Sequence, residues 1–111
     1  MYPILNYITS SNIYHNFRNV NWFYYRYVDL SSNKLGSEGG KAIAEALKVN
    51  NTLTNINLSG NKLGSEAGKV IGEALKVNST IVEIDLMNND LGPEAGKVIA
   101  EALQNNTIIV N

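Results

Sequence analysis

Three acidic side chains, two of them at matching points of a repeated pattern, are the groups of this chain best suited to chemistry. Asp29, Asp85 and the nearby Glu83 could work as paired carboxylates in acid and base catalysis. The sequence holds no Cys and one His, His15, which excludes a thiol nucleophile, a disulfide framework and a His-rich metal cluster. Nothing in the pattern encloses the carboxylates, so we expect no enzymatic activity, no cofactor and no metal.

The composition limits the kinds of partner. The 111 residues carry 9 Lys plus Arg against 10 Asp plus Glu, a formal net charge of −1, and 44% of them are hydrophobic. This content suits one compact domain. Near neutrality supplies no overall field for nucleic acid or an anionic membrane, so a partner must be recognised locally. Neither a signal peptide nor a run of ~18 apolar residues is present, and we expect a soluble, cytoplasmic protein.

A repeat of 28 residues runs through the chain. Asx-Leu pairs begin at positions 29, 57 and 85. Residues 34–52 and 62–80 agree at 15 of 19 positions, and residues 62–75 and 90–103 agree at 11 of 14. Chance does not explain such agreement. In the third unit the NNT before Ile108 comes one residue earlier than the period requires, which predicts a single deletion.

Each unit combines a short strand with a helix. Apolar and polar residues first alternate, as around Ile56 and Leu58, which is typical of a strand with one buried face. Apolar residues then recur at helical spacing over a predicted helix from about 37 to 49 and its two copies. Glu and Lys repeat three and four positions apart on these helices. A charged docking face is one interpretation, and a solvated surface with weak ion pairs is the one we favour.

The pattern L-x-x-L-x-L-x-x-N-x-L followed by a helix resembles leucine-rich repeats of the 28-residue, ribonuclease-inhibitor-like class, similar to the repeat arms of NOD-like receptors and to Ran GTPase-activating protein. The match covers residues 25–111, as three units and the start of a fourth, and leaves out residues 1–24. It implies an α/β solenoid, a short horseshoe with parallel strands on the concave face and helices on the convex face. Stacked copies would share the core that one strand and one helix cannot form alone.

Two columns of the repeat are expected to be structural. In the family, the Asn after each strand satisfies backbone groups, a task that suits an amide with donors and an acceptor. The alternative is a ladder of ligand-binding amides. A helix glycine costs roughly 1 kcal/mol against alanine, so we expect close helix-to-sheet approach to explain the helix glycines. The residues concerned are Asn33, Asn61, Asn89, Gly40, Gly68 and Gly96.

Side chains that leave the core along the strands form the candidate binding site. Strand alternation places them in columns on the inner face. Two of the columns are polar to acidic and contain no Lys, so we predict a basic or polar protein segment as partner. The alternative is that they are surface residues copied with the repeat. The candidates are Tyr27, Asp29, Ser31, Asn55, Asn57, Ser59, Glu83, Asp85 and Met87.

The two ends of the chain leave several interpretations open. All nine aromatic residues lie within residues 1–27. Residues 1–24 are a cap on the first repeat, a binding hot spot together with Arg26, or a segment that is disordered or foreign to the array. The chain stops at Asn111 inside the expected fourth strand. An open end there predicts self-association, a weak melt or a longer parent protein.

We therefore predict a noncatalytic protein-protein interaction module. The first alternative is a GTPase-activating or other regulatory role, which the resemblance allows, with Arg26 as the only arginine of the repeat region. The second is a truncated fragment with no independent function. Accelerated GTP hydrolysis would favour the first, and the absence of any specific partner would favour the second.

Overall fold

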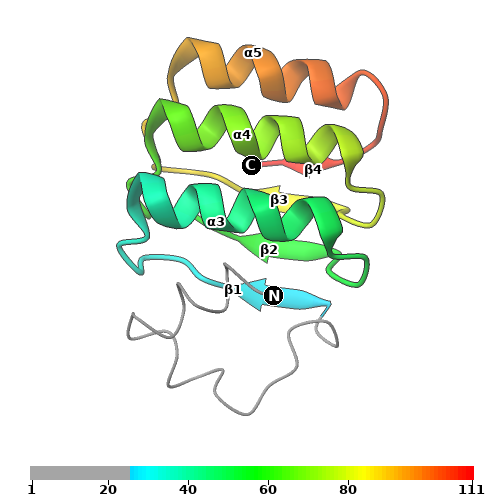
Figure 1. The fold of residues 1–111 in the computed structure, drawn as a ribbon, viewed down its shortest axis with the longest axis horizontal. Coiled ribbons are helices and arrows are strands. Elements are labelled where there is room, and N and C mark those ends of the chain that lie inside the picture. The colour runs from blue at the N-terminus through cyan, green and yellow to red at the C-terminus, as the bar shows by residue number, and fades with distance from the viewer. Residues whose placement is uncertain (1–25) are drawn as a thin grey trace.

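The computed structural model describes residues 26–111, so the expectations for residues 1–24 lie outside the described part. Strands and helices alternate along these residues (Figure 1). The elements are β1 (Tyr27–Asp29), α3 (Gly36–Val49), β2 (Asn55–Asn57), α4 (Gly64–Val77), β3 (Glu83–Asp85), α5 (Gly92–Leu103) and β4 (Ile109–Val110).

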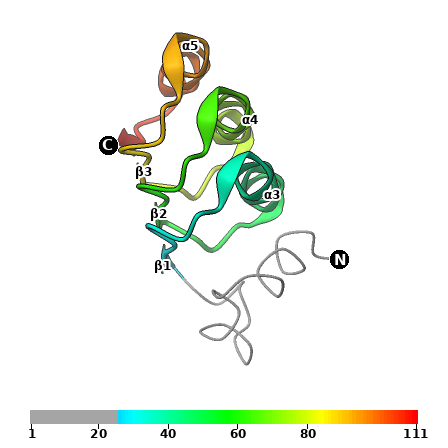
Figure 2. The same cartoon turned by 90° about the vertical axis from the view of Figure 1, so that its left-hand side faces the viewer.

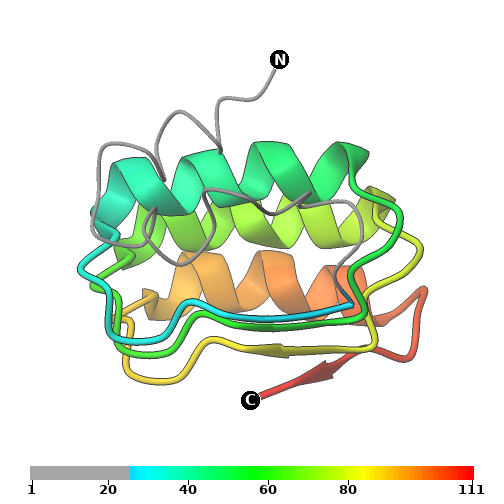
Figure 3. The same ribbon diagram turned by 90° about the horizontal axis from the view of Figure 1, so that it is seen from below.

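The strands form one parallel sheet in the order β1-β2-β3-β4. Val28 pairs with Ile56 and Ile56 with Ile84, so the register advances by one repeat per strand. Figure 2 shows the strands stacked on one side and α3, α4 and α5 stacked on the other. Seen from below in Figure 3, the strand, turn and helix of one unit lie against those of the next. The predicted α/β solenoid is confirmed.

Alternation along each strand decides which side chains face the helices. The middle residues Val28, Ile56 and Ile84 are buried, and their strand neighbours are exposed or half-buried. Burying such a side chain stabilises the fold by about 1.5–3 kcal/mol. The helices contribute the opposite wall of the same core, through Ile43, Leu47, Ile71, Leu75 and Ile99.

Each helix begins at a glycine, one residue before the predicted start. Gly36, Gly64 and Gly92 have φ values of +68°, +78° and +78°, in the left-handed region that favours glycine. An added Cβ would meet nothing within 4 Å at these positions, so backbone conformation, not space, selects glycine there. Helices α3 and α4 have 14 residues, whereas α5 has 12 and ends at Leu103.

The glycines inside the helices allow helix-to-helix contact, and the expectation of close helix-to-sheet approach is wrong. A Cβ on Gly40 of α3 would stand 2.5 Å from Ala67 Cβ of α4. A Cβ on Gly68 of α4 would stand 2.7 Å from Ala95 Cβ of α5. At Gly96 of α5 an added Cβ meets nothing within 4 Å, so no close approach accounts for this glycine in the described structure.

The fourth strand is displaced further than the sequence predicts. Asn55 pairs with Glu83 at a separation of 28, but Glu83 pairs with Ile109 at a separation of 26. The repeat is therefore two residues short at this point, not one. The shorter α5 supplies the reason, because α5 has two residues fewer than α4, whereas the connections to the next strand, residues 78–82 and 104–108, are equally long.

Candidate functional site

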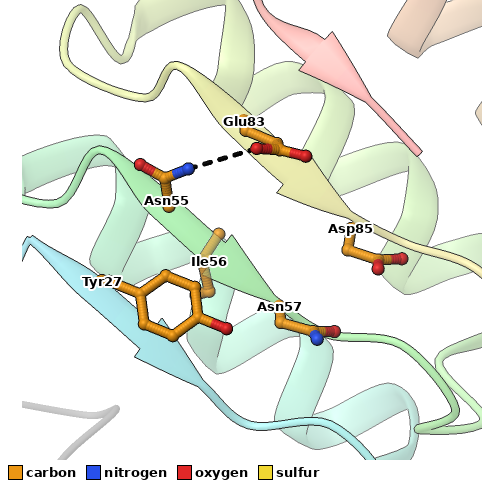
Figure 4. Close-up of a pocket in the computed structure, with 6 residues that line it drawn as sticks. All are labelled: Tyr27, Asn55, Ile56, Asn57, Glu83 and Asp85. Atoms are coloured by element: carbon orange, nitrogen blue, oxygen red, sulfur yellow. Dashed lines mark hydrogen bonds between the residues drawn. The ribbon is translucent and has the colours of Figure 1, made fainter.

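The parallel register brings the predicted strand residues into columns. Tyr27, Asn55 and Glu83 stand side by side across β1, β2 and β3. Asp29, Asn57 and Asp85 form the next column in the same way. These six side chains flank the buried middle residues, so they leave the sheet on the side away from the helices. Figure 4 shows five of them grouped over the three strands.

The columns border an open hollow of about 230 Å³ on the uncovered side of the sheet. Its lining includes Tyr27, Asn55, Asn57, Glu83 and Asp85. We call these five side chains the inner face. The hollow is edged by one aromatic ring, two amides and two carboxylates, a combination suited to a polar or cationic group with an apolar stem.

Hydrogen bonds order the first column. Asn55 Nδ2 donates to Glu83 Oε1 at 3.3 Å, the dashed line in Figure 4. Thr54 Oγ1 donates to Asn55 Oδ1 at 2.8 Å, and Asn111 Nδ2 donates to Glu83 Oε2 at 2.7 Å. The Glu83 carboxylate is thus held between two amides. Both are neutral donors, so the negative charge of Glu83 is not cancelled.

The second column also has a structural task that sequence reasoning missed. Side-chain oxygens of Asp29, Asn57 and Asp85 each accept the backbone N–H two positions on, at 2.9, 2.9 and 3.0 Å. The Ser31 hydroxyl, followed by the Ser31 backbone N–H, lowers the pKa of Asp29 below 3.8. An Asp or Asn at this position therefore closes a turn as well as facing the hollow.

The third predicted column lies outside the strands. Ser31, Ser59 and Met87 follow the last strand residue by two positions and belong to the connection toward the helix. The backbone still stacks there, since Ser32 N donates to Ser59 O and Gly60 N to Met87 O, each at 2.9 Å. The backbone N–H groups of Ser31, Ser59 and Met87 bond the second column, but none of the three residues belongs to the lining of the hollow.

One exposed apolar residue near this surface was not predicted. Ile109 of β4 pairs with Glu83 and is 54% exposed, comparable with Tyr27 at 58%. It extends the first column to a fourth strand. The alternation in the final TIIVN indicates that one isoleucine faces outward. Because the register of β4 is displaced, the sequence does not show whether this is Ile108 or Ile109.

The Asn column joins one repeat to the next. Asn61 is fully buried, and its Oδ1 accepts the N–H groups of Asn33 and Leu35 at 2.8 and 3.3 Å. Its Nδ2 donates to Leu30 O and Leu58 O, both at 2.9 Å. Asn89 makes the corresponding bonds to the repeat before it. The side-chain amides of Asn61 and Asn89 are therefore fully hydrogen-bonded to backbone groups and are not free for a ligand.

Two negative findings concern residues 26–111. No three His, Cys, Asp or Glu side chains among them are placed to hold a metal ion. None of the helices in this range is both long and apolar enough to cross a membrane.

A family model described as Leucine Rich repeat matches residues 26–44, 49–72 and 77–100. The chain belongs to the leucine-rich repeat family. Each matched segment of this leucine-rich repeat protein holds one strand and the first part of the following helix, so the family assignment and the fold agree. A comparison with curated proteins found no significant match. Leucine-rich repeats are generally protein-interaction modules and are typically noncatalytic.

Proposed function

We propose that this leucine-rich repeat chain is a noncatalytic interaction module whose inner face binds a basic or polar segment of a partner protein. The observation that carries the proposal is the register of β1, β2 and β3, which gathers carboxylates, amides and a tyrosine on a surface that no described element covers. Tyrosine contributes contact area at little entropic cost, and complementary charge favours correct encounter.

The charge of this surface supports a cationic partner. Glu83 and Asp85 line the hollow, and Asp29 pairs across the strands with Asn57, which also lines it. All nine candidate residues lack a positive charge, and the bonded amides around Glu83 are neutral. A Lys or Arg side chain could place its apolar stem along Tyr27 and its charged end between the carboxylates.

A peptide titration tests the proposal. Nuclear magnetic resonance spectra of the ¹⁵N-labelled chain are recorded with a Lys/Arg-rich decapeptide and with a Glu-rich one of the same length. We expect the basic peptide to shift the backbone signals of Asn55, Asn57 and Glu83, and the acidic peptide to leave them in place. In the triple variant Asp29→Lys, Glu83→Lys, Asp85→Lys, the preference should reverse.

The matched control changes the same charge elsewhere. Glu38, Glu66 and Glu94 are exposed in the first turns of α3, α4 and α5. Their triple replacement by Lys alters the net charge equally, and we expect it to keep binding of the basic peptide at the strands. Equal loss in both triple variants, or shifts confined to the helices, would show that only net charge matters and would refute the proposal.

Several finer predictions from the sequence accompany this proposal. They are the ribonuclease-inhibitor-like class with its NOD-like resemblance, a cytoplasmic location, the lack of nucleic-acid and membrane binding, and self-association through open ends. A GTPase-activating role is the competing function, because Arg26 is exposed directly before β1. GTP hydrolysis that the chain accelerates and that Arg26→Ala abolishes would favour it.

A further inference from the structure

The first column of the sheet has apolar side chains at both ends and polar side chains in its middle. Across β1, β2, β3 and β4 it consists of Tyr27, Asn55, Glu83 and Ile109. Tyr27 and Ile109 are 58% and 54% exposed. Single exposed apolar residues occur on every protein surface, but here two of them end one line that has an acidic group between them. A partner that covers both ends would bury apolar surface on each side of that acid.

The register fixes the distances along this column. Neighbouring strands of a sheet lie about 4.8 Å apart, so the three steps from Tyr27 to Ile109 span about 14 Å. An extended peptide rises about 3.3 Å per residue, so side chains four positions apart on one of its faces are separated by about 13 Å. The side chain midway between them falls beside the hydrogen bond that joins Asn55 to Glu83. Every second side chain of an extended segment therefore matches the column.

The middle of the column offers a carboxylate that is held in place from both sides. Glu83 Oε1 accepts from Asn55 Nδ2 of β2 at 3.3 Å, and Glu83 Oε2 accepts at 2.7 Å from Asn111 Nδ2, directly after β4. An ionised carboxylate has about four lone-pair sites, so each oxygen can accept a further donor. A Lys or Arg side chain at the midpoint can therefore bond Glu83 without displacing either amide.

The width of the surface favours an extended segment over a helix. The strands β1, β2 and β3 have three residues each, and the first and second columns stand two residues apart along them. This separation is about 7 Å, whereas a helix with its side chains is about 10–12 Å wide. A helix would therefore extend beyond both columns. An extended segment covers the first column alone.

We propose that the partner binds as an extended segment that crosses the strands along the first column and carries the pattern apolar-x-basic-x-apolar. The two outer side chains contact Tyr27 and Ile109, and the central Lys or Arg bonds Glu83. This inference rests on the proposed function, a basic or polar partner at this face, and adds the spacing and the apolar residues that the partner needs. The second column offers no such line, because it begins with the acidic Asp29.

Peptides of identical composition test the spacing. Each carries two Leu, one Arg and two Ser between Gly-Ser flanks, in the order L-S-R-S-L, L-R-S-S-L or L-L-R-S-S. In an extended chain only the first order places both Leu and the Arg on one face, because side chains alternate. We expect magnetic resonance titration of the ¹⁵N-labelled full chain to give about tenfold tighter binding for the first order than for the other two.

Variants at the two ends of the column test the apolar contacts. Tyr27→Ala and Ile109→Ala each remove one exposed apolar side chain, and each should weaken binding of the L-S-R-S-L peptide about fivefold. Met87→Ala is the matched control, because Met87 is 53% exposed and lies outside the hollow, and it should leave the affinity unchanged. Far-ultraviolet circular dichroism checks that each variant is folded. If one end variant does not fold, the other still measures the contact.

Two results would overturn this inference and leave the proposed function standing. Equal affinity for the three peptide orders, with no loss in either end variant, would show that the site recognises charge without spacing. Helical nuclear Overhauser effects within the bound peptide would show that a helix binds instead. If the Lys/Arg-rich decapeptide also fails to shift the signals of Asn55, Asn57 and Glu83, the proposed function itself is wrong.

Discussion

At the scale of single residues, asparagine does more than any charged residue to connect the repeats. The side chain of Asn61 bonds backbone groups of two successive repeats, whereas the helix ion pairs lie at the surface. Surface pairs contribute about 0–1 kcal/mol each. Buried groups left without a partner cost about 1–3 kcal/mol each, so the amides dominate.

We predict that Asn61→Ala lowers the free energy of unfolding by about 3 kcal/mol or more, because it leaves buried N–H and C=O groups of two repeats unpaired. Asn33→Ala removes one described side-chain bond and should cost about 1 kcal/mol. Urea denaturation of the two variants measures the difference. Equal losses of unfolding free energy in the two variants would show that the hydrogen bonds between repeats do not determine the cost of Asn61→Ala.

A second residue-scale prediction concerns the pKa of Asp29, which hydrogen bonds from Ser31 lower. A carboxyl group with a lower pKa in the folded state stabilises the fold above its unfolded pKa, and this contribution is lost as the pH falls through the folded pKa. We predict that Ser31→Ala raises the pKa of Asp29 toward 3.8, as measured by a carboxyl titration in magnetic resonance.

Ser59→Ala is the control for this titration. It alters the equivalent residue of the second repeat, where Asn57 replaces the titrating group. The pKa of Asp29 should stay unchanged in this variant. An unchanged pKa in Ser31→Ala as well would contradict the assignment of Ser31 as the cause. The effect on stability should be small, because Asp29 is exposed to solvent.

At the scale of elements, the distance between neighbouring helices depends on small residues. Gly40 and Gly68 each face an Ala of the next helix and the Leu just before that helix, and Gly72 stands against Val98 of α5. Lys76 adds a surface link, since its Nζ lies 3.1 Å from Glu101 Oε1 and 3.3 Å from Glu73 Oε1. The bond to Glu101 is the largest of the effects that raise the pKa of Lys76.

Substitution of two equivalent glycines should have opposite effects. A Cβ at position 68 would stand 2.7 Å from Ala95 Cβ, so Gly68→Ala forces α4 and α5 apart and should cost about 1–3 kcal/mol. A Cβ at position 96 meets nothing within 4 Å, so Gly96→Ala should stabilise the protein by about 1 kcal/mol through helix propensity. Thermal melts measure both, and destabilisation by Gly96→Ala would indicate a neighbour at that face.

At the scale of the whole molecule, the stability of each repeat depends on the repeats packed against it. α4 packs against both α3 and α5, and the core runs without interruption from Val28 to Ile108. In such an array each unit is stabilised by its neighbours, so a defect in the middle unit weakens both sides.

We predict that Leu75→Ala, at a fully buried position of α4, costs about 2–5 kcal/mol and raises amide hydrogen exchange in all three described helices. Leu103 is the corresponding, partly buried residue of α5. Leu103→Ala should cost less and act mainly on α5 and β4. Hydrogen exchange with mass spectrometry resolves the two patterns, and identical patterns would argue against nearest-neighbour coupling.

The period, the strand positions and the buried face of each helix could be read from the sequence. Alternation around Val28, Ile56 and Ile84 and helical spacing around Ile71 and Leu75 are local signals, because they depend only on which side of an element is apolar. The inner-face columns followed from the same alternation. The turn-closing bonds of Asp29, Asn57 and Asp85 and the outward-facing Ile109 were missed, and the predicted third column does not line the hollow.

Other features depended on the tertiary structure. The contact of Gly68 with Ala95, the two-residue displacement of β4 and the bond from Asn78 Nδ2 to Leu47 O all involve groups 26 to 31 positions apart. Repeats of nearly identical sequence have the same local preferences, yet each meets different surroundings. The distance between stacked repeats and the unit before or after each one therefore decide three things. They decide whether a neighbouring side chain occupies the space beside a glycine, which register a strand takes and which backbone carbonyl accepts from an amide.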